Sequence, residues 1–252
     1  MIASKFSYLG GFVGTSNVYA AYLNGIPALG TVAHSYIMSF EKEEDIANSR
    51  VLDGVDLLEA AMKYRTELGW NETNLGELYA YVGFAFAYPN AFSALVDSYS
   101  TMNSGIKNYL LLTLVLKDLG YTAKGIRLDS GDLAQLSKDC KALVSEIGKK
   151  YGHDFSDTQV VASNDINEKT LHELIKNNHQ IDVFGIGTNL VTCQAQPALG
   201  MVYKVTEFQG TARMKFSEEI EKLCLPGAKS TFRIYQEEGK PSFDLLCLAS
   251  EV

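Results

Sequence analysis

The chain has 252 residues, of which 46% are hydrophobic and 21% are charged, a composition typical of a globular protein with a full core. Its formal net charge at pH 7 is −8 and it contains no basic run, which argues against a nucleic-acid-binding surface. The longest apolar run, residues 109–116, is too short to cross a bilayer, and the first residues lack the apolar core of a signal peptide.

Apolar segments that predict strands alternate with periodic segments that predict helices over about the first 200 residues. In chain order we expect a helix over 16–24, a strand over 26–30, a helix over 46–68, a strand over 94–98, a helix over 104–119, a strand over 123–128, a helix over 133–149, a strand over 159–163, a helix over 167–177 and a strand over 181–185. Residues 78–88 fit either a helix or a strand. This alternation predicts a parallel sheet in an α/β barrel, with functional groups at the carboxyl ends of the strands.

The pattern changes near residue 201. Residues 201–206 and 231–235 read as strands, and no long helical pattern follows Gly200. We therefore expect an α/β barrel over 1–200 and a β-rich segment over 201–252.

The four cysteines are far apart and form no CxxC pair. A zinc site and a disulfide framework are therefore not expected, and a reducing, cytoplasmic compartment is the default.

Four polar clusters follow predicted strands, and in a closed barrel all four would face one opening. They are Thr31 with His34, Arg127 with Asp129 and Asp132, Asn164 with Asp165, and Gly185 with Gly187 and Thr188.

Each cluster also has an ordinary structural interpretation. His34 alone fits a hydrogen-bonded structural histidine as well as a catalytic one. The guanidinium of Arg127 suits a carboxylate or phosphate ligand, and Asp129 could accept sugar hydroxyls or hold Mg²⁺ through water, but a local salt bridge with a helix cap at Ser130 or Asp132 explains the same residues. The glycine turn at 185–188 suits phosphate or serves as a plain turn.

Five stretches together resemble the nicotinate phosphoribosyltransferase family, and the similarity extends over nearly the whole chain. They are residues 8–18, 30–35, 125–132, 162–165 and 184–188. The resemblance implies an irregular α/β barrel of the type II phosphoribosyltransferase kind. It also implies the reaction of nicotinate with 5-phosphoribosyl 1-diphosphate to give nicotinate mononucleotide and diphosphate, with ATP hydrolysis, in the salvage synthesis of NAD.

The resemblance implies roles for individual residues. His34 would be phosphorylated by ATP and would act catalytically with Arg127 and Asp129. Substrate-binding residues would be Thr31 and Arg127 at nicotinate, Asp129 and Asp165 at ribose hydroxyls, Gly187 and Thr188 at the 5-phosphate, and Ser35 and Asn164 nearby. Mg²⁺, with Mn²⁺ as an alternative, would assist, and the family forms homodimers whose active sites take residues from both subunits.

Family members carry a sizeable segment before the stretch that begins here at Tyr8, so we expect this chain to be truncated at its N-terminus. The β-rich segment would then belong to a second domain whose N-terminal portion is absent. One alternative is a catalytically incomplete fragment that binds a phosphorylated ligand or a full-length partner subunit. Another is a related barrel transferase that acts on nicotinamide or quinolinate.

Overall fold

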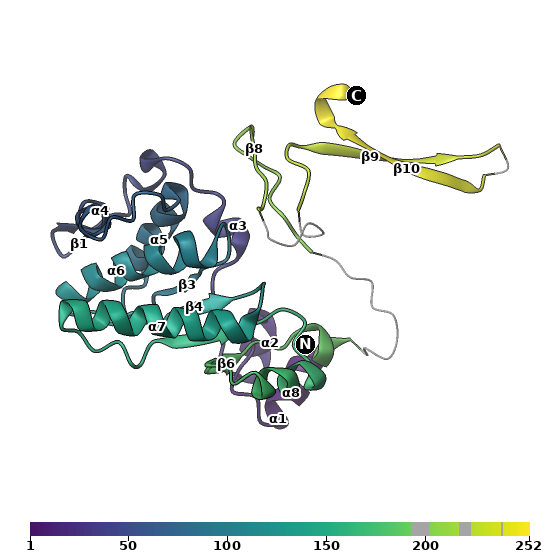
Figure 1. The fold of residues 1–252 in the computed structure, drawn as a ribbon. Coiled ribbons are helices and arrows are strands. Elements are labelled where there is room, and N and C mark those ends of the chain that lie inside the picture. The colour runs from purple at the N-terminus through teal and green to yellow at the C-terminus, as the bar shows by residue number, and fades with distance from the viewer. Residues whose placement is uncertain (193–201, 217–222, 238) are drawn as a thin grey trace. The chain divides into compact units, whose positions relative to one another are not determined.

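A computed structural model describes residues 1–192, 202–216, 223–237 and 239–252. The chain divides into two units, Met1–Met201 and Val202–Val252. The predicted α/β class is confirmed in the first unit, which contains a four-stranded parallel sheet (Figure 1).

The sheet has the strand order β3-β4-β5-β6, so its neighbours in space follow one another along the chain. In register, Ala94 pairs with Ile126, which pairs with Val160. All pairs are parallel, so the carboxyl ends of the four strands lie at one edge. The strands are β3 (Ser93–Leu95), β4 (Gly125–Leu128), β5 (Gln159–Ala162) and β6 (Val183–Phe184).

Helices connect these strands and bury the sheet. Asp132 caps the amino end of the longest one, α7, by accepting a hydrogen bond from the Gln135 amide at 3.0 Å, and Gly152 ends it with φ of 69°. Helix α7 packs against β4 and β5. The connecting helices are the π-helical turn η2 (Thr101–Gly105), α6 (Ile106–Asp118), α7 (Leu133–Tyr151), α8 (Glu168–Lys176) and, after β6, α9 (Thr188–Val191).

Helix α6 forms the centre of the core, because most of its side chains are buried, including the polar Asn108 and Thr113. It packs against α4 and α5, which precede the sheet in the sequence. The elements before β3 are α1 (Ile2–Leu9), α2 (Val18–Asn24), α3 (His34–Ile37), η1 (Glu43–Ile46), β1 (Val51–Leu52), β2 (Val55–Asp56), α4 (Leu57–Glu67) and α5 (Leu75–Ala87).

The second unit contains two antiparallel hairpins in its described residues. One joins β7 (Glu207–Phe208) to β8 (Thr211–Ala212), and the other joins β9 (Lys229–Tyr235) to β10 (Pro241–Leu248), followed by η4 (Ala249–Glu251). Residue 201 of the predicted strand over 201–206 lies outside the described residues, and 202–206 are not a strand.

Two predicted elements in the first unit are wrong. Residues 26–30 form no strand; the segment makes one isolated bridge, between Thr15 and Ala28. The helix predicted over 46–68 begins only at Leu57, because Asp53 and Gly54 adopt positive φ and turn the chain into the β1–β2 hairpin. Residues 78–88, left open between helix and strand, belong almost wholly to α5.

No helix within the described parts of the chain is long and apolar enough to span a membrane.

Candidate active site

The carboxyl edge of the sheet carries a polar side chain after each of its first three strands. Asp97 follows β3, Asp129 follows β4, and Ser163 follows β5, while Arg127 lies within β4. Because the strands are parallel neighbours, these residues meet although up to 66 positions separate them in the sequence. The predicted gathering of polar groups at this edge is therefore present in the described residues.

His34 reaches this edge as the first residue of α3 and not, as predicted, after a strand. Its Nε2 atom lies 3.0 Å from Asp97 Oδ1, and the two side chains are 13% and 2% exposed. The other Asp97 oxygen accepts a hydrogen bond from the Ser130 hydroxyl. A carboxylate oxygen accepts hydrogen bonds, so the contact with Asp97 is made by a proton on Nε2 of His34.

The Nδ1 atom of His34 lies 4.0 Å from Asp129 Oδ2. This pair connects the histidine to a second group of hydrogen bonds around Arg127. The His34 side chain is therefore mostly buried in a polar environment, since a carboxylate lies beside each of its two ring nitrogens.

Arg127 donates three hydrogen bonds from three different nitrogens. Nε donates to Ser163 Oγ at 2.8 Å, Nη1 to Thr31 Oγ1 at 3.1 Å and Nη2 to Asp129 Oδ1 at 2.9 Å. Ser163 also donates to Asp129. The local salt bridge weighed from the sequence is therefore real, and the same guanidinium also holds Thr31 and the loop after β5 in place.

The loop after β5 has an unusual backbone. Asn164 and Asp165 adopt φ of 105° and 49°, a region that non-glycine residues rarely occupy. Such conformations cost free energy and cluster at functional sites. Asn164 is half-buried and Asp165 is exposed at the carboxyl edge of the sheet.

The glycine turn after β6 lies at the same edge. The Gly185 amide donates to Ala162 O at 2.8 Å, which continues the pairing with β5, and the four-residue helix α9 starts at Thr188. Gly187 and Thr188 are exposed, and a Cβ at Gly187 would meet nothing within 4 Å. Ser35 is half-buried beside His34 in α3.

Asp97 and Ser163 received no role from the sequence, and Ser130 received only that of a possible helix cap. The sequence held a usable signal for Asp97, because a polar side chain at the end of the strand predicted over 94–98 belongs to the same pattern as the clusters that were selected. Asp132 has the structural role that the sequence analysis gave as an alternative, because it caps the amino end of α7.

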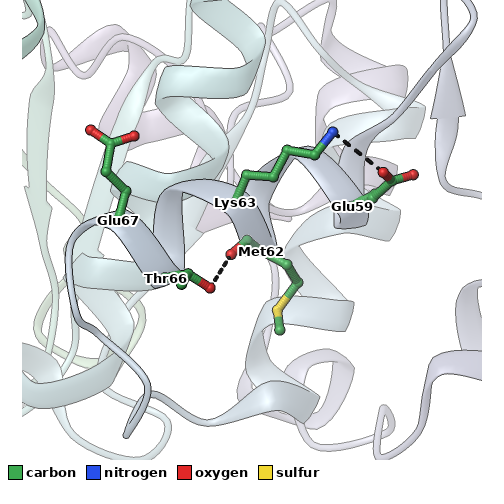
Figure 2. A pocket seen from close by; sticks show the side chains of 5 residues that line it. All are labelled: Glu59, Met62, Lys63, Thr66 and Glu67. Atoms are coloured by element: carbon green, nitrogen blue, oxygen red, sulfur yellow. Dashed lines mark hydrogen bonds and ion pairs between the residues drawn. The ribbon is translucent and has the colours of Figure 1, made fainter.

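A hollow of about 540 Å³ on the surface of α4 is separate from these residues. Figure 2 shows that its five lining side chains all come from that one helix, and Lys63 pairs with Glu59 at 3.3 Å. Since one helix face lines it, this hollow offers no converging polar groups of the kind that a substrate site needs.

The described residues contain no group of three or more histidine, cysteine or acidic side chains that could enclose a metal ion. Mg²⁺ in phosphate-transfer sites is commonly held by one or two carboxylates and by substrate phosphates. Asp129, whose Oδ2 faces His34, and the exposed Asp165 fit that arrangement.

Comparison with known proteins places this geometry in a family. Residues 2–222 match the profile of the nicotinate phosphoribosyltransferase (NAPRTase) family. The chain belongs to this family. It is 50% identical to the nicotinate phosphoribosyltransferase of Dictyostelium discoideum over 251 residues, which cover 98% of this chain and 43% of that protein. It is 40% identical to the nicotinate phosphoribosyltransferase of Homo sapiens over 264 residues, which cover 100% of this chain and 49% of that protein.

The crystal structure of human nicotinic acid phosphoribosyltransferase is similar in fold, with a TM-score of 0.67 and 36% sequence identity over 99% of this chain and 49% of that one. The family resemblance stated from the five sequence stretches is confirmed. The chain spans about half the length of the relatives it matches.

Proposed function

We propose that this chain carries the catalytic residues of a nicotinate phosphoribosyltransferase that makes nicotinate mononucleotide and diphosphate from nicotinate and 5-phosphoribosyl 1-diphosphate, with ATP hydrolysis, in the salvage synthesis of NAD. The observation that supports it most is the placement of His34, with Nε2 on Asp97 and Nδ1 facing the Asp129–Arg127 group.

His34 is proposed to accept a phosphoryl group from ATP. The lone pair on Nδ1 attacks the γ-phosphorus, an N–P bond forms, the bond between that phosphorus and its bridging oxygen breaks, and ADP leaves with the electron pair. The Nε2 proton stays on the ring, and the buried Asp97 carboxylate stabilises the positive charge that the ring gains. Asp97 therefore orients His34 and raises the basicity of Nδ1.

The ribosyl transfer is proposed to use the remaining residues of the edge. Displacement of diphosphate develops positive charge on the sugar and negative charge on the leaving group. Arg127 and Thr31 would bind the nicotinate carboxylate, Asp129 and Asp165 the ribose hydroxyls, and the turn at 187–188 the 5-phosphate, with Ser35 and Asn164 as neighbouring contacts. Mg²⁺, or Mn²⁺, would neutralise charge on the phosphates when bound.

The complete protein is proposed to form an irregular α/β barrel that includes β3 to β6 and a homodimer with shared active sites. Exposed apolar side chains on α1 and α2 support a missing neighbour: Ile2, Phe6 and Tyr22 are 75%, 64% and 83% exposed. The same observation favours the second candidate, a fragment that binds phosphorylated ligand or a full-length subunit without turnover. The free Cys140, Cys224 and Cys247 support a reducing, cytosolic location.

Labelling with γ-³²P-ATP tests the proposed phosphohistidine. The purified chain is expected to take up acid-labile, alkali-stable phosphate, and His34→Ala is expected to take up none, while His172→Ala, an exposed control on α8, labels like wild type. Equal labelling of the wild type and His34→Ala would remove His34 from the mechanism. Formation of nicotinate mononucleotide by the same preparation separates the enzyme from the binding fragment.

A further inference from the structure

We propose that Tyr81 and Glu77 of α5 are positioning residues for the active site, because they fix the strand end that carries Asp97 and thereby the orientation of His34. This inference rests on the proposed role of His34, but the contacts that carry it are made to Leu95 and Val96 and not to the histidine.

Tyr81 holds the last residue of β3. Its hydroxyl donates a 2.7 Å hydrogen bond to Leu95 O, two residues before Asp97. The Tyr81 side chain is buried, as the residue is 1% exposed. A buried hydroxyl that donates to a backbone carbonyl at a strand end fixes the direction in which the chain continues.

Glu77 lies one helical turn before Tyr81, and the residue is fully buried. Its Oε2 accepts hydrogen bonds from the Ser104 hydroxyl and from Asn108 Nδ2, the latter at 3.0 Å. Burial, with a smaller contribution from the Asp97 charge, raises the pKa of Glu77 to about 8. At neutral pH Glu77 is therefore mostly an uncharged acid.

The uncharged acid has one proton to donate. Oε2 accepts two hydrogen bonds, whereas the buried Oε1 has no hydrogen-bond partner among the described residues, and the carboxyl lies beside the Tyr81 hydroxyl. Tyr81 gives its own proton to Leu95 O, so its oxygen is available as the acceptor. A proton on Oε1 would point to this oxygen and would favour the one hydroxyl rotamer of Tyr81 that holds β3.

Gly105 constrains the same segment from the π-helical turn η2. A Cβ at this position would lie 1.9 Å from Val96 O, so the backbone of the turn touches the residue just before Asp97. On the other side, the Val96 amide donates to Arg127 O at 3.2 Å. Residues 95–97 are therefore fixed by α5, η2 and β4 together, and Asp97 has little freedom to follow His34 if one of these contacts is lost.

The test compares two tyrosine variants that each lose one buried hydroxyl. Tyr81→Phe removes the hydrogen bond to Leu95 O. Tyr109→Phe is the control: Tyr109 is equally buried in the same core, but its hydroxyl makes no hydrogen bond among the described residues, so only the loss of a buried hydroxyl is shared. Both variants keep the ring, and circular dichroism verifies their folding.

The main readout is the ¹⁵N imidazole spectrum of the full chain, in which the His34 signals are those absent from His34→Ala. Wild type and Tyr109→Phe are expected to give the signals of a single tautomer protonated at Nε2. Tyr81→Phe is expected to shift them toward a mixture of tautomers and to slow phosphorylation by ATP about tenfold, as expected when one buried hydrogen bond is lost. This spectrum requires no phosphorylation, so it decides the proposal even if the proposed reaction of His34 is wrong.

Two Glu77 variants provide the second arm. Glu77→Gln keeps an uncharged group that can both donate and accept, and it is expected to preserve the wild-type His34 spectrum. Glu77→Ala is expected to shift the spectrum in the same direction as Tyr81→Phe. Ser104→Ala, which removes one donor to Glu77, is expected to give a smaller shift and replaces Glu77→Ala if that variant does not fold. A wild-type His34 spectrum in folded Tyr81→Phe, or equal shifts in Tyr81→Phe and Tyr109→Phe, would overturn the proposal.

Discussion

Replacement of Glu77 by glutamine is expected to change how the stability of the first unit depends on pH. The pKa of Glu77 is raised from 4.5 to about 8 in the folded chain, chiefly by burial. The folded state therefore keeps a proton that the unfolded state has already released at intermediate pH. Stability from this group is fully present below about pH 4.5 and is lost as the pH rises through about 8.

The size of the effect follows from this shift. The free energy of unfolding of the wild type should fall by up to about 1.4 kcal/mol per pH unit relative to Glu77→Gln, or about 2.5 kcal/mol between pH 5 and pH 7. The amide oxygen of glutamine can still accept from Ser104 and Asn108, so the comparison changes the titrating group and keeps the hydrogen bonds.

Urea unfolding followed by the fluorescence of Trp70, the single tryptophan, measures this difference at several pH values. Trp70 lies in the segment between α4 and α5 and packs against the core of the first unit, so it reports on the unfolding of the unit that contains Glu77. Glu59→Gln is the control, because the Glu59 side chain is 67% exposed on α4. A difference between wild type and Glu77→Gln that stays constant from pH 5 to pH 8 would refute the argument for a buried, uncharged acid.

Three further outcomes are expected. Arg127→Lys should weaken nicotinate binding by about tenfold or more in calorimetry, because a lysine cannot donate to Thr31, Ser163 and Asp129 from one rigid plane; unchanged affinity would place the nicotinate carboxylate elsewhere. Asp132→Ala should lower the free energy of unfolding by about 1 kcal/mol and leave phosphorylation of His34 unchanged, because Asp132 caps α7; loss of phosphorylation in a folded variant would give it a substrate role. Gly105→Ala should lower the melting temperature, measured by calorimetry, because the added methyl group overlaps the Val96 carbonyl; a wild-type value would contradict the close approach.

The parallel sheet could be predicted because its strands are short apolar runs between clear helical segments. The runs at 123–128 and 159–163 match β4 and β5 to within two residues. The helix predicted over 46–68 failed in its first part because a local turn outweighed hydrophobic periodicity. Val51 and Val55 fit a helical face, but the turn at Asp53 and Gly54 folds them into a hairpin, in which Val51 pairs with Asp56 and Leu52 with Val55.

The site could be predicted in outline, because polar residues after parallel strands must meet at one edge. The hydrogen-bond partner of His34 could not be predicted from the sequence, because the choice between Asp97 and other carboxylates depends on the path of the chain before α3. The predicted strand over 26–30 put His34 directly on the sheet. In the structure the histidine reaches the edge from a short helix, and a contact 63 residues away in sequence holds it there.

The hydrogen bonds of Arg127 reconcile its two sequence interpretations. A guanidinium has five N–H groups, and contacts with the described residues use one on each nitrogen. One N–H on Nη1 and one on Nη2 are left over by these contacts, and two guanidinium N–H groups that point the same way can bind a carboxylate with two parallel hydrogen bonds. The local salt bridge therefore does not compete with a ligand for Arg127. It fixes the plane of the guanidinium, so the nicotinate carboxylate proposed as its ligand would meet donors that are already oriented.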